Sequence, residues 1–280
     1  MKPHNFSRRT ALKTGLTALA ATVIPTCESF ATEKSAGETR IMVIGGDYWH
    51  NPIPIENHWR EVTDSTDWRV MFAQSAQFVT PEILSTLDLF ILVRGTDPDD
   101  FGWSPDGIIE KRPSPALFMT EIQENAIIEN VNRGMGLLCM HSSTRFPRNP
   151  KFIEFIGLQR SVPHGALQGT TCHSFNQNHP ITQGIKDFKI ELDQTINPPL
   201  IEKVCTLLFK ATGQIDQNED NVAWCLERGK GRIVALLPGH LPAPRNLAQY
   251  KQIMWRAAHW AMKRDIPEIT FRGGTPFRFK

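Results

Sequence analysis

The first half of the chain alternates short apolar runs with segments of helical periodicity. Three apolar runs predict buried parallel strands, over residues 40–46, 68–73 and 87–93. Two segments between them predict helices, over residues 55–63 and 80–84. Thr80 and Pro81 are typical of a helix start, with the threonine as the cap. This βαβαβ order predicts an α/β fold.

Residues 94–115 interrupt this alternation with a long stretch rich in Gly, Pro and Asp, which predicts a lid or binding loop. Thr120 and Gln123 then match a capping box before a helix that ends at Arg133-Gly134. The apolar run after that glycine predicts a fourth strand leading directly into His141.

The second half has a more mixed pattern. It predicts five further strands, over residues 170–175, 188–192, 203–210, 222–226 and 232–237, and helices near 150–156 and over 247–263. Glycines at 229 and 231 indicate a hairpin between the last two strands. We find no repeat or linker, so residues 32–280 are expected to form a single domain with its core at about 40–263.

The N-terminal residues are typical of a cleaved export signal. Arg8 and Arg9 precede an uncharged run that ends at Ile24 and is too short to span a bilayer. Ser29 and Ala31 are small residues at the positions that a signal peptidase reads. We therefore predict that residues 1–31 are a twin-arginine signal peptide and that the protein is periplasmic or secreted.

The charge balance argues against two classes of partner. The whole chain has a formal net charge of +2, and cleavage after Ala31 would remove four basic residues and one acidic residue. The remainder is close to neutral and has no basic stripe, so neither nucleic-acid binding nor membrane insertion after signal cleavage is expected. The oligomeric state is not predicted.

The cysteines beyond the signal do not have the spacing of a zinc or redox motif. Cys139, Cys205 and Cys225 lie in predicted strands, where a free thiol packs as a small apolar group. An oxidising compartment leaves a Cys205–Cys225 bridge open if their strands are neighbours.

The turn after the fourth strand is the strongest candidate for a functional site. In a sharp strand-to-helix elbow, the residues two positions before and after the apex must be small. With His141 at the apex these are Cys139 and Ser143, whereas a Cys139 apex would place Leu137 and His141 there. The pattern therefore favours His141, and it disfavours a nucleophilic cysteine of the amidotransferase type.

Several ordered motifs resemble the ThuA-like (trehalose utilisation) family, which belongs to the class I glutamine amidotransferase-like superfamily. They are Gly45-Gly46-Asp-Tyr-Trp-His50, the run from Gly134 to Ser142, His179-Pro-Ile-Thr-Gln-Gly184, Val222-Ala-Trp224 with Gly229-Lys-Gly-Arg232, and Gly239-His240. The resemblance implies a flavodoxin-like three-layer sandwich with a mostly parallel central sheet. It also implies a carbohydrate partner, expected to be a disaccharide or a keto-sugar derivative.

The resemblance breaks down at one place. Where the family typically has an Asp-Glu-x-Tyr run, this chain has Asp193, Gln194 and Ile196. If the acid at the second position of that run is a base or a ligand in relatives, its exchange for Gln194 predicts altered specificity or weakened catalysis. We expect Asp193 to orient one of the histidines described next.

Three histidines follow predicted strands, namely His50, His141 and His240. Open parallel sheets bind ligands beyond the carboxyl ends of their strands, so we expect these imidazoles to meet there. They would serve as general acids and bases or would hold a divalent metal ion. His141, His240 and Asp193 are our catalytic candidates, although His141 and His240 would be structural if they only organise their turns.

The remaining candidates would bind a sugar. Tyr48, Trp49 and Trp103 lie in predicted loops, where aromatic faces stack on sugar rings, and Ser142 and His50 add polar contacts. His179 is either a further contact or a structural residue. We expect an enzyme of carbohydrate catabolism, and the rivals are a non-catalytic sugar-binding or sensing module and a cysteine hydrolase.

Overall fold

The computed structural model describes residues 34–47, 50–95, 118–146, 149–194 and 196–273, together with the backbone of 101–103 and 109–111. The predicted signal peptide, residues 1–31, lies outside these ranges. No helix in the described part of the chain is long and apolar enough to cross a membrane.

One half of the central sheet consists of parallel strands. They follow the order β2 (Arg69–Ala73), β1 (Arg40–Ile44), β3 (Leu89–Leu92), β6 (Gly136–Met140) and β11 (Gly231–Leu236). All four of these neighbouring pairs are parallel, so the carboxyl ends of β1, β3, β6 and β11 lie along one edge. The strands predicted from the apolar runs of the first half are confirmed, and each is one to three residues shorter than its run.

The other half of the sheet is antiparallel. It continues from β11 through β10 (Glu219–Arg228), β9 (Thr206–Gly213), β7 (Leu167–Ser174) and β8 (Phe188–Gln194). The turn at Gly229 confirms the predicted hairpin between β10 and β11. Short connections reverse the chain direction, whereas parallel pairing needs a longer crossover, so the sheet is mixed across its full width.

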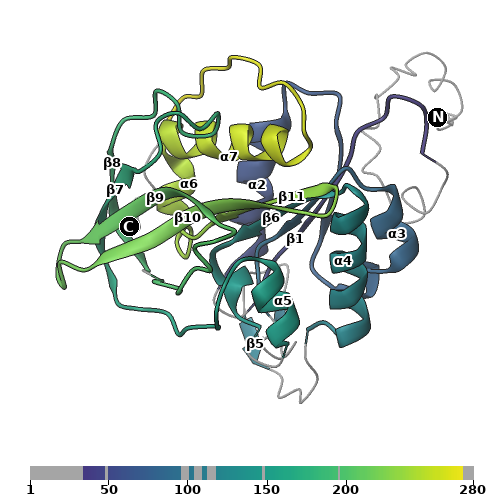
Figure 1. Cartoon of the computed structure of the whole chain (residues 1–280), viewed down its shortest axis with the longest axis horizontal. Helices are drawn as coiled ribbons and strands as arrows, with labels where there is room; N and C mark the ends of the chain where they lie inside the picture. The colour runs from purple at the N-terminus through teal and green to yellow at the C-terminus, as the bar shows by residue number, and fades with distance from the viewer. Residues whose placement is uncertain are drawn as a thin grey trace, which may run out of the picture.

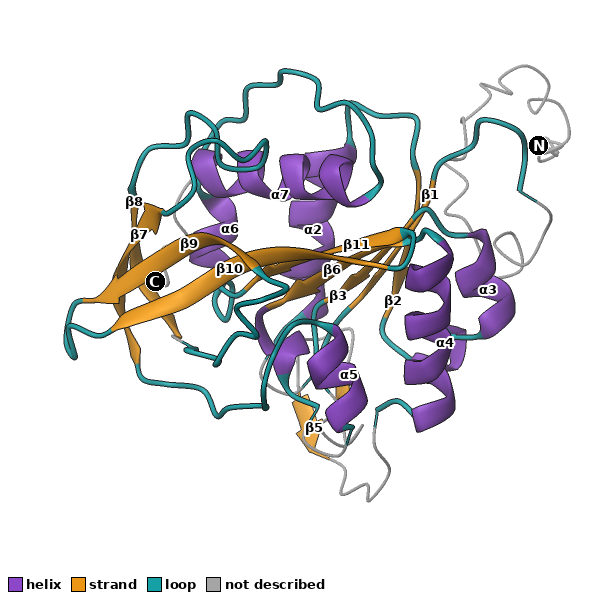
Figure 2. Cartoon of the chain, in the orientation of Figure 1, coloured by secondary structure: helices purple, strands orange, loops and turns teal. Residues whose placement is uncertain are grey.

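Helices cover both faces of the sheet and complete the three layers (Figures 1 and 2). One face carries α2 (Pro52–Thr63), α6 (Pro242–Asn246) and α7 (Ala248–Ala261), which contact one another. The opposite face carries α3 (Pro81–Thr86), α4 (Glu121–Arg133) and α5 (Pro150–Phe155). Short 3₁₀ turns, η1 (Ala76–Phe78) and η2 (His141–Thr144), and a small hairpin, β4 (Phe101–Trp103) with β5 (Ile109–Lys111), complete the elements. This hairpin lies within the predicted loop 94–115.

Local capping explains where the crossover helices begin and end. Thr80 accepts a hydrogen bond from the backbone N–H of Ile83, and the capping box of Thr120 with Gln123 is present in full. Gly134 ends α4 with φ of +133°, a conformation that residues with a side chain rarely adopt. The predicted helix boundaries at these positions are confirmed.

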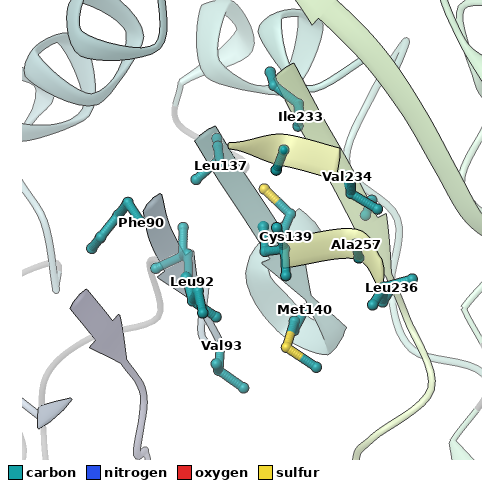
Figure 3. Close-up of a cluster of buried hydrophobic side chains, with 14 of the residues drawn as sticks. Phe90, Leu92, Val93, Leu137, Cys139, Met140, Ile233, Val234, Leu236 and Ala257 are labelled. Carbon is teal, nitrogen blue, oxygen red and sulfur yellow. The ribbon is translucent and has the colours of Figure 1, made fainter. Parts of the chain in front are cut away.

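The core lies between the parallel strands and the helices on either side. Leu92, Leu137, Cys139 and Val234 are fully buried and form one apolar cluster across three adjacent strands (Figure 3). Such continuous apolar burial is expected of strands that are covered on both faces.

The cysteines of the described chain are all free thiols. Cys205, which was predicted to lie in a strand, directly precedes β9, whose first residue, Thr206, pairs with Cys225. The thiol of Cys205 donates to the carbonyl of Gly157 at 3.2 Å, so the open possibility of a bridge is not realised.

Candidate functional site: three histidines at the sheet edge

His141 occupies the elbow predicted after β6. Its φ of +47° is unusual for a residue with a side chain, and its surface is 1% exposed. The neighbouring chain is tightly packed, since a Cβ on Gly95 would lie 2.8 Å from the carbonyl oxygen of Ser142. Nδ1 of His141 is 3.0 Å from the carbonyl oxygen of Leu237, just beyond β11. The elbow is therefore fixed by both neighbouring strand ends.

His50 follows β1 through a short hydrogen-bonded loop. The backbones of Asp47 and His50 form a bridge, and Asp47 Oδ1 accepts from the backbone N–H of His50 at 3.0 Å. The same oxygen lies 2.6 Å from Nδ1 of the His50 ring. Arg94, just beyond β3, donates to the carbonyl of Gly46 at 2.7 Å. Because a carboxylate oxygen only accepts hydrogen bonds, its contact with Nδ1 places the ring proton of His50 on that nitrogen, and Asp47 thus fixes the tautomer.

The loop after β11 is held by buried polar groups from three other elements. Asp193, at the end of β8, accepts from the backbone N–H of Gly239 at 2.7 Å and of Leu241 at 3.2 Å. Tyr250 donates to the carbonyl of Pro238 at 2.6 Å, and Arg245 donates to the carbonyl of Gly239. Asp193 contacts the backbone on both sides of His240 and so positions this histidine without touching its ring.

The three imidazoles meet at the carboxyl edge of the parallel strands. The ring centroid of His50 lies 4.8 Å from that of His141 and 5.0 Å from that of His240. His141 and His240 are 5.3 Å apart, and Nε2 of His50 is 3.1 Å from Nδ1 of His240. His50 and His141 are buried, whereas His240 is half-buried. The structure therefore brings together the three histidines that strand position alone suggested.

A fourth imidazole, His164, was not singled out from the sequence. Its ring stacks on that of His141 with centroids 5.0 Å apart and an interplanar angle of 22°. Gln194, at the end of β8, donates to the adjacent carbonyl of Gly165 at 3.2 Å. His164 precedes β7 and follows no strand of the parallel half, so its only sequence signal is a histidine between Pro163 and Gly165.

The surroundings favour the uncharged form of His141, His164 and His240. Burial, together with the nearby rings of His50 and His164, lowers the pKa of His141 well below 6.5. Burial is also the main cause that lowers the pKa of His164 and of His240 to about 4. Burial raises the pKa of Asp193 to about 6, against the opposing effect of its backbone hydrogen bonds. Near neutral pH these three histidines are therefore uncharged, and a ring nitrogen that carries a lone pair can bind a cation.

Of the sugar-binding candidates, Ser142 lies at the histidine cluster and His179 lies away from it. Ser142 lies beside His141 in η2, and its hydroxyl is buried with no hydrogen-bond partner among the described residues. His179 is remote, because its ring packs on Trp260 at 5.2 Å and its Nε2 lies 3.5 Å from Cys225 Sγ. It contacts none of the three clustered histidines in the described structure. Tyr48, Trp49 and the side chain of Trp103 lie outside the described residues.

Cys139 is unsuited to act as a nucleophile. Its side chain is fully buried in the apolar cluster of Figure 3, on the strand that leads into the elbow. Burial raises the pKa of this thiol to about 12, so the reactive thiolate is strongly disfavoured.

Comparison with known proteins assigns the family. The family model for trehalose utilisation, ThuA, matches residues 40–261. A ThuA-like protein from Bacteroides uniformis has a TM-score of 0.62 at 11% identity, covering 82% of this chain and 94% of that chain. One from Parabacteroides merdae has a TM-score of 0.60 at 16% identity, covering 83% and 93%. A beta-galactosidase from Rahnella sp. R3 has a TM-score of 0.51 at 12% identity, covering 82% of this chain and 32% of that chain. No curated protein matches the sequence.

Proposed function

Because this chain belongs to the ThuA family of trehalose utilisation, we propose that it acts on a disaccharide or a keto-sugar derivative at the site formed by His50, His141 and His240. The family supports a role in carbohydrate catabolism. The histidine cluster supports catalysis, since its location is where parallel α/β sheets bind small molecules.

The observation that carries the proposal is the meeting of three imidazoles, two of which have a hydrogen-bond partner that fixes the position of the ring proton. Asp47 holds the proton of His50 on Nδ1, and the carbonyl of Leu237 does the same for His141. Each ring is left with an Nε2 lone pair that can accept a proton. Proton transfer to and from sugar hydroxyls, or at the carbon beside a keto group, is carried out by side chains such as histidine that lie within hydrogen-bond reach of the substrate.

The test is a panel of disaccharides and their oxidised derivatives, assayed for product by chromatography. His141→Asn removes the imidazole, and asparagine tolerates the positive φ of this position better than alanine does. His240→Ala removes a half-buried ring from the loop. Both variants should lose turnover by at least about 100-fold, the usual range for loss of an acid or base.

The matched control is His173→Ala, which removes an exposed imidazole paired with Asp187 outside the cluster. Its turnover should equal that of the wild type. Retention of full activity by folded His141→Asn and His240→Ala, judged by unchanged circular dichroism, would remove the proposal.

Gln194 favours one alternative, a non-catalytic sugar-binding module. An amide takes the place of an acid of the family pattern, and its Nε2 is bonded to the carbonyl of Gly165. Binding of a sugar from the same panel with no product formed would select this reading.

We also propose that the protein is exported through the twin-arginine route. Arg8 and Arg9 before the uncharged run support it. Replacing both arginines by lysine should move the protein from the periplasmic to the cytoplasmic fraction in uncleaved form. An unchanged distribution would contradict the proposal.

A further inference from the structure

In two of the clustered histidines, Nδ1 has a hydrogen-bond partner of the kind that the non-coordinating nitrogen of a metal-bound histidine usually has. Nδ1 of His50 lies 2.6 Å from the carboxylate of Asp47, and Nδ1 of His141 lies 3.0 Å from the carbonyl oxygen of Leu237. Metal-bound histidines almost always have their free N–H bonded to a carboxylate or a backbone carbonyl. Both Nε2 atoms are therefore available as ligands.

The spacing of the nitrogens is close to that of a shared ion. Nε2 of His50 and Nδ1 of His240 are 3.1 Å apart. Two ligands about 2.0–2.1 Å from a tetrahedral ion are separated by about 3.3–3.4 Å. One ligand atom from each of the three histidines lies within 4.8 Å of the others. His240 is half-buried, so its ring has room to adjust as the set closes around an ion.

An independent observation comes from His141. Its Nε2 is buried and has no hydrogen-bond partner in the described part of the chain. The residue is 1% exposed, and leaving a buried polar atom unpaired costs about 1–3 kcal/mol. A neutral imidazole can satisfy such a nitrogen by donating its lone pair to a cation.

We propose that His50, His141 and His240 bind one divalent transition-metal ion through Nε2, Nε2 and Nδ1 respectively. This inference rests on the proposed function only in that it assigns a ligand to the same site. Three neutral imidazoles suit Zn²⁺ and its neighbours Co²⁺, Ni²⁺ and Cu²⁺, and they disfavour Mg²⁺ and Ca²⁺. Three protein ligands leave a position for water or substrate, as in catalytic rather than structural zinc sites.

The scaffold around the site is built for fixed ligand positions. Arg94 holds the loop before His50 through the carbonyl of Gly46, and Asp193 holds the backbone on both sides of His240. His141 is locked in its elbow between neighbouring chain segments. These groups come from elements that are separate in the sequence, and they fix the backbone that carries the three histidines before any ion arrives.

The experiment titrates Zn²⁺ alone into full-length protein that carries no histidine tag and has been stripped with EDTA. Isothermal calorimetry should give one tight site per chain, and Co²⁺ should give the intense visible absorption of a tetrahedral centre. Loss of a residue that is hydrogen-bonded to a metal ligand weakens metal binding by roughly 10–100-fold. His141→Asn and His240→Ala each remove a ligand itself, so each should weaken Zn²⁺ binding by more than this. Asp47→Asn should weaken it by about 10–100-fold.

His173→Ala is the control, because it removes an exposed histidine outside the cluster, and its binding should be unchanged. Absence of a tight site in the wild type, or equal binding by wild type and His141→Asn, would overturn the proposal. The 3.1 Å contact of His50 with His240 would then be a hydrogen bond. Absence of a tight Zn²⁺ site together with turnover by the metal-free protein overturns the metal site while the proposed function stands. Tight Zn²⁺ binding without any sugar chemistry supports the metal site and removes the proposed function.

Discussion

Asp193 connects the far edge of the sheet to the loop of His240, and its removal should alter stability in a pH-dependent way. The residue is 2% exposed and accepts hydrogen bonds from the backbone N–H groups of Gly239 and Leu241. Burial raises its pKa from 3.8 to about 6. The folded state therefore retains a proton that the unfolded state has already lost in this range.

The sign of the effect follows from that difference. As the pH falls from above 6 toward 4, the folded protein takes up the proton first, so this group increases stability. With about 1.36 kcal/mol per pKa unit, the gain from Asp193 between about pH 7.5 and about pH 5 is about 1.4 kcal/mol. Asp193→Ala loses this gain, and it leaves the buried N–H of Gly239 unpaired at a cost of about 1–3 kcal/mol at either pH.

The free energy of unfolding should be measured by urea denaturation in EDTA, with tryptophan fluorescence, at both pH values. The deficit of Asp193→Ala relative to the wild type should be larger at pH 5 by about 1.4 kcal/mol. Asp187→Ala is the control, because its hydrogen bond to His173 lowers the pKa of this exposed carboxyl. The ordinary pKa of this carboxyl, 3.8, is already below pH 5, so it is ionised in the folded and unfolded states at both pH values and its deficit should not change. An Asp193→Ala deficit that is equal or smaller at pH 5 would refute the reasoning.

Three further outcomes are expected. Thr120→Ala removes the capping box of α4 and should lower the free energy of unfolding by about 1 kcal/mol in urea denaturation, with turnover unchanged. Gly239→Ala forces a Cβ into a backbone with φ of +136°, and thermal denaturation should show a loss of roughly 1–3 kcal/mol together with reduced activity. The folded pKa values of His141, His164 and His240 lie below the ordinary 6.5, so the stability they contribute is present above pH 6.5 and lost below it. The melting temperature in EDTA should therefore fall steeply between pH 6.5 and about 4, and His164→Asn should flatten the fall; a flat wild-type profile would contradict this.

The strands and crossover helices of the first half were predictable because their signals are local. Apolar runs, the capping box at Thr120 and the glycine at 134 each act within a few residues, and the structure confirms them. The hairpin at Gly229 was equally visible. The short α6 was missed, because its segment, Pro242–Asn246, carries two prolines and reads as a loop.

The candidate site was only partly predictable. His50, His141 and His240 follow parallel strands, and parallel strands end at a common edge, so their meeting could be inferred without coordinates. His164 could not be inferred, because it reaches the cluster through the path of a loop before β7. The surroundings of His179 could not be inferred either, because they depend on how α7 packs.

The sequence by itself determined the α/β class, the elbow at His141 and the three strand ends that carry histidines. Each of these depends on residue spacing within one element, where side-chain size and backbone preference decide the outcome. Only the tertiary structure decided that Asp193 supports the His240 loop from the opposite half of the sheet, and that His164 lies against His141. Such contacts join residues far apart in the chain, and their energy depends on the curvature and packing of the whole sheet, which no local pattern records.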